Sequence, residues 1–209
     1  MTRILIADDH TVVRKGLKLI LAEEFSSVHI EEVADAENLV KKVISETWDV
    51  IITDLSMPGR SGLDALQQIK QHYPKLPVLI LSVHPEEQYA LRVLKAGAAG
   101  YLNKDMATEE LVTAVKRVLS GRKYISPSVA EKMAVSLDKD ADKLPHEYLS
   151  DREFDVLKLI ASGNSVSQIA EILSLSSTTV STYRARIMAK MNLKNNTSLT
   201  LYAIENKII

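Results

Sequence analysis

The sequence contains no cysteine. Disulfide bonds, zinc–thiolate sites and cysteine nucleophiles are therefore excluded, which is typical of a protein from a reducing cytoplasm. The chain also lacks an apolar run near the roughly 20 residues that a membrane helix needs. Its first apolar run, Ile4–Ala7, is too short for the core of a signal peptide. These absences predict a cytoplasmic protein that does not bind membranes.

A strong excess of either charge is missing as well. The 26 basic and 27 acidic side chains give a formal net charge of −1, so the overall charge gives no indication of nucleic-acid binding. A DNA-binding signal must therefore be local. The 46% hydrophobic and 25% charged residues are ordinary for a globular protein, and 209 residues are enough for one large or two small domains.

Short apolar runs alternate with helical patterns as far as Gly121. The predicted strands are Ile4–Ala7, Val28–Val33, Val50–Thr53, Val78–Leu81 and Gly100–Leu102. The predicted helices are Thr11–Glu23 (burying Val12, Leu17, Ile20 and Leu21), Ala36–Ser45, Leu63–His72, Pro85–Ala96 with proline in its first turn, and Thr108–Leu119 behind a Thr-x-Glu start signal. This alternation predicts an α/β fold, a doubly wound five-stranded parallel sheet of order 2-1-3-4-5.

The pattern changes after Gly121. A helix is predicted over Ser126–Leu137, and the charged stretch Asp138–Lys143 has the composition of an interdomain linker. Beyond Leu149 the predicted elements are all helices: Asp151–Ala161, Val166–Leu173, Ser177–Met191 and Asn196–Glu205. We expect an α/β domain over residues 1–122, a linker over 123–145 and a smaller all-α domain over 146–209.

Polar side chains follow four of the predicted strands. Asp8 and Asp9 follow the first strand, Asp54 the third, Ser82 the fourth and Lys104 the fifth. In a sheet of order 2-1-3-4-5 these ends converge at the switch point, where ligands bind. Crowded carboxylates resist ionisation unless a cation joins them, and Mg²⁺ prefers such oxygen ligands. Together with a lysine and a hydroxyl, the group suits phosphoryl transfer.

Each of these residues also has an ordinary structural interpretation. Asp8 and Asp9 are compatible with a helix cap, Ser82 with a turn and Lys104 with a solvated surface charge. Taken singly, the two interpretations are about equally good. Their joint placement at the ends of four strands favours the functional one.

The first part of the chain resembles the receiver domain of two-component response regulators, over roughly residues 2–121. The resemblance rests on Asp8-Asp9, Asp54-Leu55-Ser56-Met57-Pro58-Gly59 with Gly62, Ser82, and Tyr101-Leu102-Asn103-Lys104. It implies that Asp54 accepts a phosphoryl group from a histidine kinase, and that Mg²⁺ is held by Asp8, Asp9, Asp54 and the backbone carbonyl of Ser56. It also implies that Lys104 pairs with the phosphate, Ser82 turns toward it and Tyr101 moves inward. Without the family, Tyr101 reads as a half-buried aromatic at the sheet edge.

A hydrolase with an aspartyl-phosphate intermediate is the rival class. Haloacid-dehalogenase-like phosphatases carry Asp-x-Asp after a strand, and the second aspartate is their general acid. Here Ser56 occupies the position two after Asp54, so no acid protonates a leaving group. We therefore expect no enzyme beyond self-phosphorylation and dephosphorylation at Asp54. Ser56 and His84 are expected to flank the water path to the phosphoryl group.

The stretch from Gln168 to Met191 has helix-turn-helix proportions. On the second helix Val180, Ile187 and Met191 share one face, with Tyr183 and Arg184 at its borders. Ser181, Thr182, Ala185 and Arg186 then point outward, as on a recognition helix in a major groove. Arg184, Arg186 and Lys190 concentrate positive charge suited to DNA phosphates. A solvated basic helix in an all-α bundle is the alternative.

Residues 146–209 resemble the DNA-binding output domain of the LuxR/NarL (FixJ) class. The matching residues are Leu149-Ser150-Asp151-Arg152-Glu153, Val156-Leu157, Ile160-Ala161-Ser162-Gly163, Ile169-Ala170, Leu173, Ser176, Thr179-Val180, Ile187 and Lys190-Met191. The resemblance implies DNA contacts from Thr179, Ser181, Thr182, Tyr183, Arg184, Arg186 and Lys190, and dimerisation through a last helix around Thr197–Glu205. The apolar residues there, Leu199, Leu201, Ile204 and Ile208, are equally compatible with ordinary core. Ser167 and Ser181 replace residues that are usually basic, so we expect DNA binding to depend strongly on dimerisation.

The combined interpretation is a transcriptional response regulator that acts by a population shift. Phosphorylated Asp54 favours one receiver conformer, which dimerises or releases the output domain onto double-stranded DNA. The partners are then a cognate histidine kinase, double-stranded DNA and a second copy of the chain. A phospho-switch whose helical domain binds a protein in place of DNA is the alternative.

Overall fold

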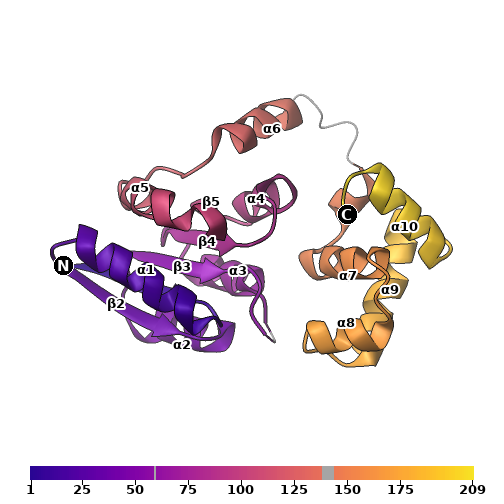
Figure 1. Ribbon diagram of the computed structural model, residues 1–209, viewed down its shortest axis with the longest axis horizontal. Helices are drawn as coiled ribbons and strands as arrows, with labels where there is room; N and C mark the ends of the chain where they lie inside the picture. Colours follow the sequence, from indigo (N-terminus) through magenta and orange to yellow (C-terminus); the bar gives the residue numbers. More distant parts are fainter. Residues whose placement is uncertain (59, 138–143) are drawn as a thin grey trace. The chain divides into compact units, whose positions relative to one another are not determined.

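The computed structural model describes residues 1–58, 60–137 and 144–209. The chain forms two compact units, Met1–Ala134 and Val135–Ile209, coloured indigo to salmon and salmon to yellow in Figure 1. Gly59 of the predicted acidic-site segment and the charged stretch Asp138–Lys143 lie outside the described residues. Each unit is described by itself.

The first unit is built on the five parallel strands β1 (Thr2–Ala7), β2 (Val28–Val33), β3 (Val50–Asp54), β4 (Val78–Ser82) and β5 (Gly100–Asn103). Their order is β2-β1-β3-β4-β5, which confirms the predicted topology. The central strands β3 and β4 are buried throughout, as expected of strands covered on both faces. Between the strands lie α1 (Thr11–Glu24), α2 (Ala36–Ser45), α3 (Gly62–His72) and α4 (Glu86–Lys95). The 3₁₀ turn η1 (Lys104–Met106) and α5 (Ala107–Leu119) follow β5.

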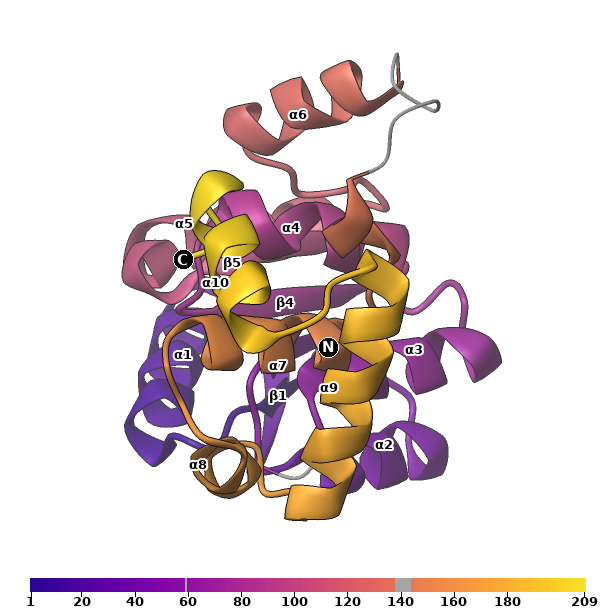
Figure 2. The same cartoon turned by 90° about the vertical axis from the view of Figure 1, so that its right-hand side faces the viewer.

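Two helices, α1 and α5, cover one face of the sheet. Their apolar side chains pack on those of alternate strand positions, including Ile4, Ile6, Ile52 and Leu81. On the opposite face α2 and α3 lie side by side, and Figure 2 shows the sheet between the two helical layers. The carboxyl ends of the strands therefore remain at one open edge, where a site can form.

Three local expectations need correction. Val12 is 83% exposed, whereas Leu17 and Leu21 face the sheet. At about 100° per residue, Val12 lies half a turn away from Leu21, so the two cannot share a face. Pro85 precedes α4 as its N-cap residue, and α5 begins at Ala107 behind η1, not behind a cap made by Thr108.

The predicted helix after the receiver is confirmed as α6 (Pro127–Leu137). Tyr124, which precedes it, forms a parallel bridge to Gly100, and its backbone N–H donates a 2.8 Å hydrogen bond to the carbonyl of Ala99. The start of the predicted linker is thus attached to the receiver sheet. The boundaries at 122 and 145 stay predictions.

The second unit is all-α, as predicted. It contains the 3₁₀ turn η2 (Pro145–Tyr148), α7 (Asp151–Ala161), α8 (Val166–Ile172), α9 (Ser177–Met191) and α10 (Asn196–Glu205). Ser150 with Glu153 and Ser165 with Gln168 form capping boxes that begin α7 and α8. The core gathers apolar side chains from all four α-helices, among them Leu157, Ile169, Val180 and Leu199.

Within the part of the chain that the structure describes, none of the helices combines the length and apolar character needed to cross a bilayer.

Candidate functional site

Asp54 ends the central strand β3, and its carboxylate is buried. The backbone N–H of Ser56 donates a 3.1 Å hydrogen bond to Asp54 Oδ1 as the chain turns out of the strand. Gly62, the first residue of α3, packs directly on this turn. A Cβ at Gly62 would lie 1.8 Å from the Asp54 carbonyl oxygen, so only glycine fits there. The close approach holds the backbone of Asp54 in place.

Asp54 and Asp8 share one cation. Lys104 Nζ lies 2.7 Å from Asp54 Oδ2 and 2.7 Å from Asp8 Oδ2, and all three side chains are largely buried. Asn103 positions the lysine, because its side chain accepts a 2.9 Å hydrogen bond from Asp105 N and thereby caps η1. The three residues, predicted from the ends of separate strands, are brought together at one edge of the sheet.

The buried setting changes the pKa values of Asp54 and Lys104. Burial raises the pKa of Asp54, although Lys104 acts in the opposite direction. Burial alone would lower the pKa of Lys104, but its close contacts with the Asp54 and Asp8 carboxylates prevail and raise the pKa. One lysine faces several carboxylates, so a further cation would stabilise the site.

The carboxylates fit a divalent cation. Asp8, Asp9, His10 and Asp54 each offer a ligand atom within 4.8 Å of the others. Asp8 Oδ2 and Asp9 Oδ1 are buried and accept no well-directed hydrogen bond, although they lie within ion-pair distance of Lys104 and His10 respectively. Buried oxygens without hydrogen bonds normally have another partner, and hard oxygen ligands are those that Mg²⁺ prefers.

His10 and Arg14 support this site, although the sequence patterns did not single them out. The backbone N–H of His10 donates a 2.7 Å hydrogen bond to Asp8 Oδ1, and its ring Nδ1 lies 2.8 Å from Asp9 Oδ1. The Arg14 guanidinium donates a 2.5 Å hydrogen bond to the Asp8 carbonyl. The sequence could have indicated a role for His10 at this site, because His10 directly follows two carboxylates at the end of a strand.

The loop after β4 carries the predicted switch residues. Ser82 is fully buried, and its Oγ accepts a 3.1 Å hydrogen bond from the backbone N–H of His84. Tyr101 is buried and donates a 2.7 Å hydrogen bond to the His84 carbonyl. The His84 ring stacks on Tyr89, with ring centroids 4.7 Å apart, and its Nε2 lies 3.0 Å from Ser56 Oγ. His84 therefore links Ser82, Tyr101 and the residue beside Asp54.

In the second unit, α9 has the predicted two-sided character. Val180, Ile187 and Met191 are buried, whereas Ser181, Thr182 and Arg186 are exposed. Ser176 caps the helix by accepting a 3.1 Å hydrogen bond from Thr179 N, and its hydroxyl also lies 2.8 Å from that of Thr179. Ser177 and Thr178, in the exposed first turn, were not predicted as contacts.

Two of the predicted basic contacts are engaged inside the domain. Lys190 Nζ donates a 2.6 Å hydrogen bond to Glu153 Oε2, and the same oxygen accepts a 2.7 Å hydrogen bond from Ser150 N in the cap of α7. Burial would raise the pKa of Glu153, but hydrogen bonds from Lys190 and Ser150 outweigh it and lower the pKa. Arg184 Nε donates a 2.8 Å hydrogen bond to Asn196 Oδ1. Lys190 and Arg184 thus fasten α9 to its neighbours, although Lys190 stays partly exposed, and the exposed Arg186 points away from the domain core.

Both units match known protein families. The model for the response regulator receiver domain matches residues 4–116, and the model for bacterial regulatory proteins of the luxR family matches residues 147–203. The response regulator UvrY of Escherichia coli is 36% identical over 207 residues, covering 99% of this chain and 95% of that protein. The oxygen regulatory protein NreC of Staphylococcus carnosus is 38% identical over 214 residues, covering 99% of each chain.

Solved structures give the same result. The complex of the two-component response regulator RcsB with DNA is 30% identical, with a TM-score of 0.59 and coverage of 96% of each chain. RcsB from Salmonella enterica serovar Typhimurium, bound to promoter rprA in the presence of phosphomimetic BeF3-, has a TM-score of 0.64 at 29% identity, covering 97% of this chain and 98% of that one.

The fold and the acidic edge define a receiver, here joined to a helix-turn-helix output unit. With family models matching both units and relatives matching the full length, the chain belongs to the two-component response regulators of the LuxR/NarL (FixJ) class. It is a transcription regulator that responds to a histidine kinase, and its relatives are response regulators, not metabolic enzymes.

Proposed function

We propose that Asp54 is the phosphoacceptor of this regulator and that its aspartyl phosphate controls dimerisation and DNA binding. The observation that carries the proposal is the shared contact of Lys104 with Asp54 and Asp8, at 2.7 Å each, in a buried setting. A transferred phosphoryl group adds negative charge beside Asp54, and Lys104 is the cation positioned to neutralise it.

Asp8, Asp9, Asp54 and the Ser56 backbone carbonyl would hold Mg²⁺, whose charge would help to neutralise the phosphoryl oxygens. The buried oxygens of Asp8 and Asp9, which accept no well-directed hydrogen bond from Lys104 or His10, support this ligand set. The chain's own chemistry would be limited to gain and loss of the phosphoryl group at Asp54. The side chains of Ser56 and His84, whose Oγ and Nε2 atoms lie 3.0 Å apart, would restrict the approach of water to the phosphoryl group.

The switch would begin at Ser82. Its hydroxyl oxygen accepts a hydrogen bond from the backbone N–H of His84, and the Tyr101 hydroxyl donates one to the carbonyl of the same residue. If Ser82 turns toward a phosphate oxygen, the His84 hydrogen bond is lost and the loop before α4 moves. A phosphoryl group that contacts only one loop conformer shifts the population toward it.

The output would be the recognition helix α9. Ser181, Thr182 and Arg186 would contact DNA directly, with Thr179, Tyr183, Arg184 and Lys190 nearer the domain body. Phosphorylated homodimers would place two such helices on half-sites roughly one helical turn, or about 10 bp, apart. We place this activity in the cytoplasm, where a regulator of transcription meets its DNA.

The test is labelling with acetyl phosphate and Mg²⁺. Asp54→Asn should abolish labelling, because it removes the nucleophilic carboxylate while keeping the side-chain volume. Asp49→Asn, which changes an aspartate at the opposite end of β3, is the matched control and should label normally. Undiminished labelling of Asp54→Asn would overturn the assignment. DNA selection with phosphorylated protein should then recover paired half-sites, and recovery of no enriched sequence would overturn the proposed output.

A further inference from the structure

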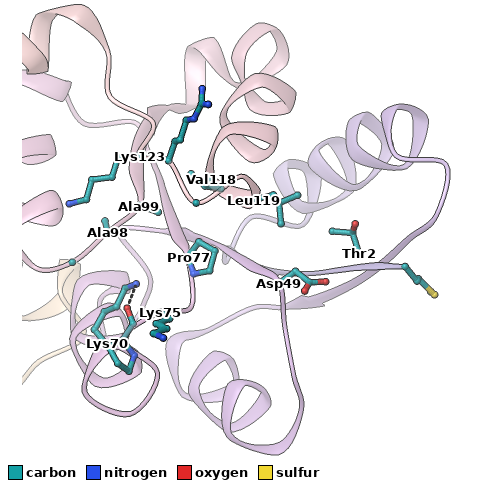
Figure 3. Close-up of a pocket in the computed structure, with 15 residues that line it drawn as sticks. Thr2, Asp49, Lys70, Lys75, Pro77, Ala98, Ala99, Val118, Leu119 and Lys123 are labelled. Carbon is teal, nitrogen blue, oxygen red and sulfur yellow. Dashed lines mark hydrogen bonds between the residues drawn. The ribbon is translucent and has the colours of Figure 1, made fainter.

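A second pocket lies at the edge of the receiver sheet opposite Asp54. It has a volume of about 720 Å³ and includes residues that directly precede strands: Asp49 before β3, Pro77 before β4, and Ala99 before β5. Asp54 is the last residue of β3, at that strand's other end. Because the strands are parallel, the pocket and the proposed phosphorylation site lie at opposite ends of the strands. Figure 3 shows the residues that line the pocket.

The pocket is lined with positive charge. Lys70 and Lys75 come from the end of α3 and the loop after it, and Arg122 and Lys123 come from the chain after α5. Figure 3 shows Lys70 and Lys75 on one side and Lys123 on another. Among the described lining residues, Asp49 is the single acidic one, and its Oδ2 accepts a 2.8 Å hydrogen bond from the backbone N–H of Arg3. The lining thus carries a clear excess of positive charge.

Lys70 is held in position by its surroundings. Its ammonium donates hydrogen bonds of 2.6 Å to the Leu76 carbonyl and 3.3 Å to the Pro74 carbonyl. Its aliphatic stem lies under Gly97, where a Cβ would be 3.3 Å from Lys70 Cγ and where φ is +100°. Burial lowers the pKa of Lys70, and the charge of Lys123 lowers it further. A bound anion would relieve this repulsion, and an ammonium with two carbonyl partners has one donor left.

Four apolar residues, Pro77, Ala98, Val118 and Leu119, also line the pocket. Its volume of several hundred Å³ is within the range of sites for small ligands. Lysine ammonium groups bind phosphate as point charges.

We propose that this pocket binds a small phosphorylated anion, of the size and charge of a nucleoside diphosphate. Lys75 and Lys123 would contact its phosphates from two sides, with Lys70 beneath them. The pocket also includes residues of the segment that connects α5 to α6. Lys123 is followed by Tyr124, which bridges Gly100 at the β5 edge, so a ligand here contacts the segment leading to α6. The site would give the regulator a second input that does not use Asp54.

The experiment is titration of the full, unphosphorylated chain with ADP, pyrophosphate, inorganic phosphate and adenosine, in EDTA to prevent Mg²⁺-dependent binding near Asp54. Calorimetry gives the affinity, and ¹⁵N–¹H NMR locates the ligand. ADP and pyrophosphate should bind and shift the amides of Gly97 and Gly121 without shifting those of Ser56 and His84. Adenosine should not bind. If only inorganic phosphate binds at Gly97 and Gly121, the proposed ligand class is wrong.

Lys75→Gln with Lys123→Gln should weaken ADP binding by about tenfold or more, because both phosphate contacts lose their charge. Lys15→Gln with Lys41→Gln removes the same charge from α1 and α2 and is the matched control. Equal loss in both variants, or no loss in either, would overturn the proposal. Lys70→Met, in protein that keeps the wild-type NMR spectrum, should also weaken ADP binding because the half-buried ammonium is lost, and an unchanged affinity would exclude Lys70 from the site. Binding that persists in Asp54→Asn would separate this site from the proposed phosphorylation.

Discussion

The receiver buries its functional charges against one another, whereas the output unit leaves its own exposed. Asp8, Asp54 and Lys104 contact each other directly in the sheet edge. Ser181, Thr182 and Arg186 face solvent on α9, and the Thr182 hydroxyl donates a hydrogen bond to the Thr178 carbonyl of its own helix. The acidic site of the receiver is preorganised for a small group at a fixed position. The exposed face of α9 depends on the packing of that helix on its domain, which the ion pair of Lys190 with Glu153 stabilises.

The largest effect is expected at Lys104. Lys104→Met should cost about 3 kcal/mol of receiver stability without Mg²⁺, because two buried carboxylates lose their cation. Mg²⁺ should restore part of the loss. Urea unfolding with and without Mg²⁺ measures both. Lys116→Met removes an exposed ion pair with Glu24 and should cost only about 0.5 kcal/mol. Equal losses of unfolding free energy in the two variants would show that the buried contacts of Lys104 stabilise the receiver no more than an exposed ion pair does.

Breaking the pair that fastens α9 should have the next largest effect. Glu153→Gln should cost about 2 kcal/mol in the second unit, because glutamine still fits a capping box but cannot form the ion pair with Lys190. Hydrogen exchange of the buried Val180 and Ile187 amides measures it. A double-mutant cycle with Lys190→Met should reveal coupling, and strict additivity would contradict the interpretation.

The same pair makes a pH prediction. The pKa of Glu153 is lowered in the folded state, so its stabilising contribution is fully present above the ordinary glutamate value of about 4.3. The contribution is lost as pH falls through the lowered folded value. Calorimetric unfolding between about pH 6 and pH 3 should therefore show wild type and Glu153→Gln converging at the acid end. A constant gap across that range would refute the assignment.

A smaller effect is expected on the exposed face. Arg186→Ala should weaken DNA binding by about 1 kcal/mol and lower the salt slope by about one, because a phosphate contact is lost. Titrations of labelled DNA at several salt concentrations measure both quantities. Lys207→Ala, a basic residue after α10, is the control. An unchanged slope for Arg186→Ala would exclude a phosphate contact.

The smallest effect is expected beside Asp54. Replacing both Ser56 and His84 by alanine should shorten the phosphoryl lifetime about threefold, because removing their 3.0 Å contact opens the approach of water. Following the decay of labelled protein tests this. Val83→Ala changes an exposed neighbour and should leave the lifetime unchanged. If the double variant decays at the wild-type rate, the two residues do not guard the phosphoryl group.

The sequence predicted the receiver more fully than the output surface, for a physical reason. Buried strands and carboxylates at their ends leave strong patterns, so β3, Asp54 and Lys104 could be placed without coordinates. The error at Val12 was avoidable, because helical periodicity alone places Val12 half a turn away from the buried Leu21. The sequence pattern could not show that Lys190 binds Glu153, because their contact joins residues 37 positions apart. The partners of a long side chain depend on tertiary packing.

The bridge between Tyr124 and Gly100 bears on solubility. β5 is the last strand of the sheet, and an uncovered edge strand offers unpaired backbone groups to other chains. Tyr124 occupies part of that edge, and a Cβ on Gly100 would lie 2.8 Å from its carbonyl oxygen. Gly100→Ala would therefore push the exit segment away from the sheet. The exposed edge would then invite pairing between molecules, so self-association should rise before the receiver loses its fold.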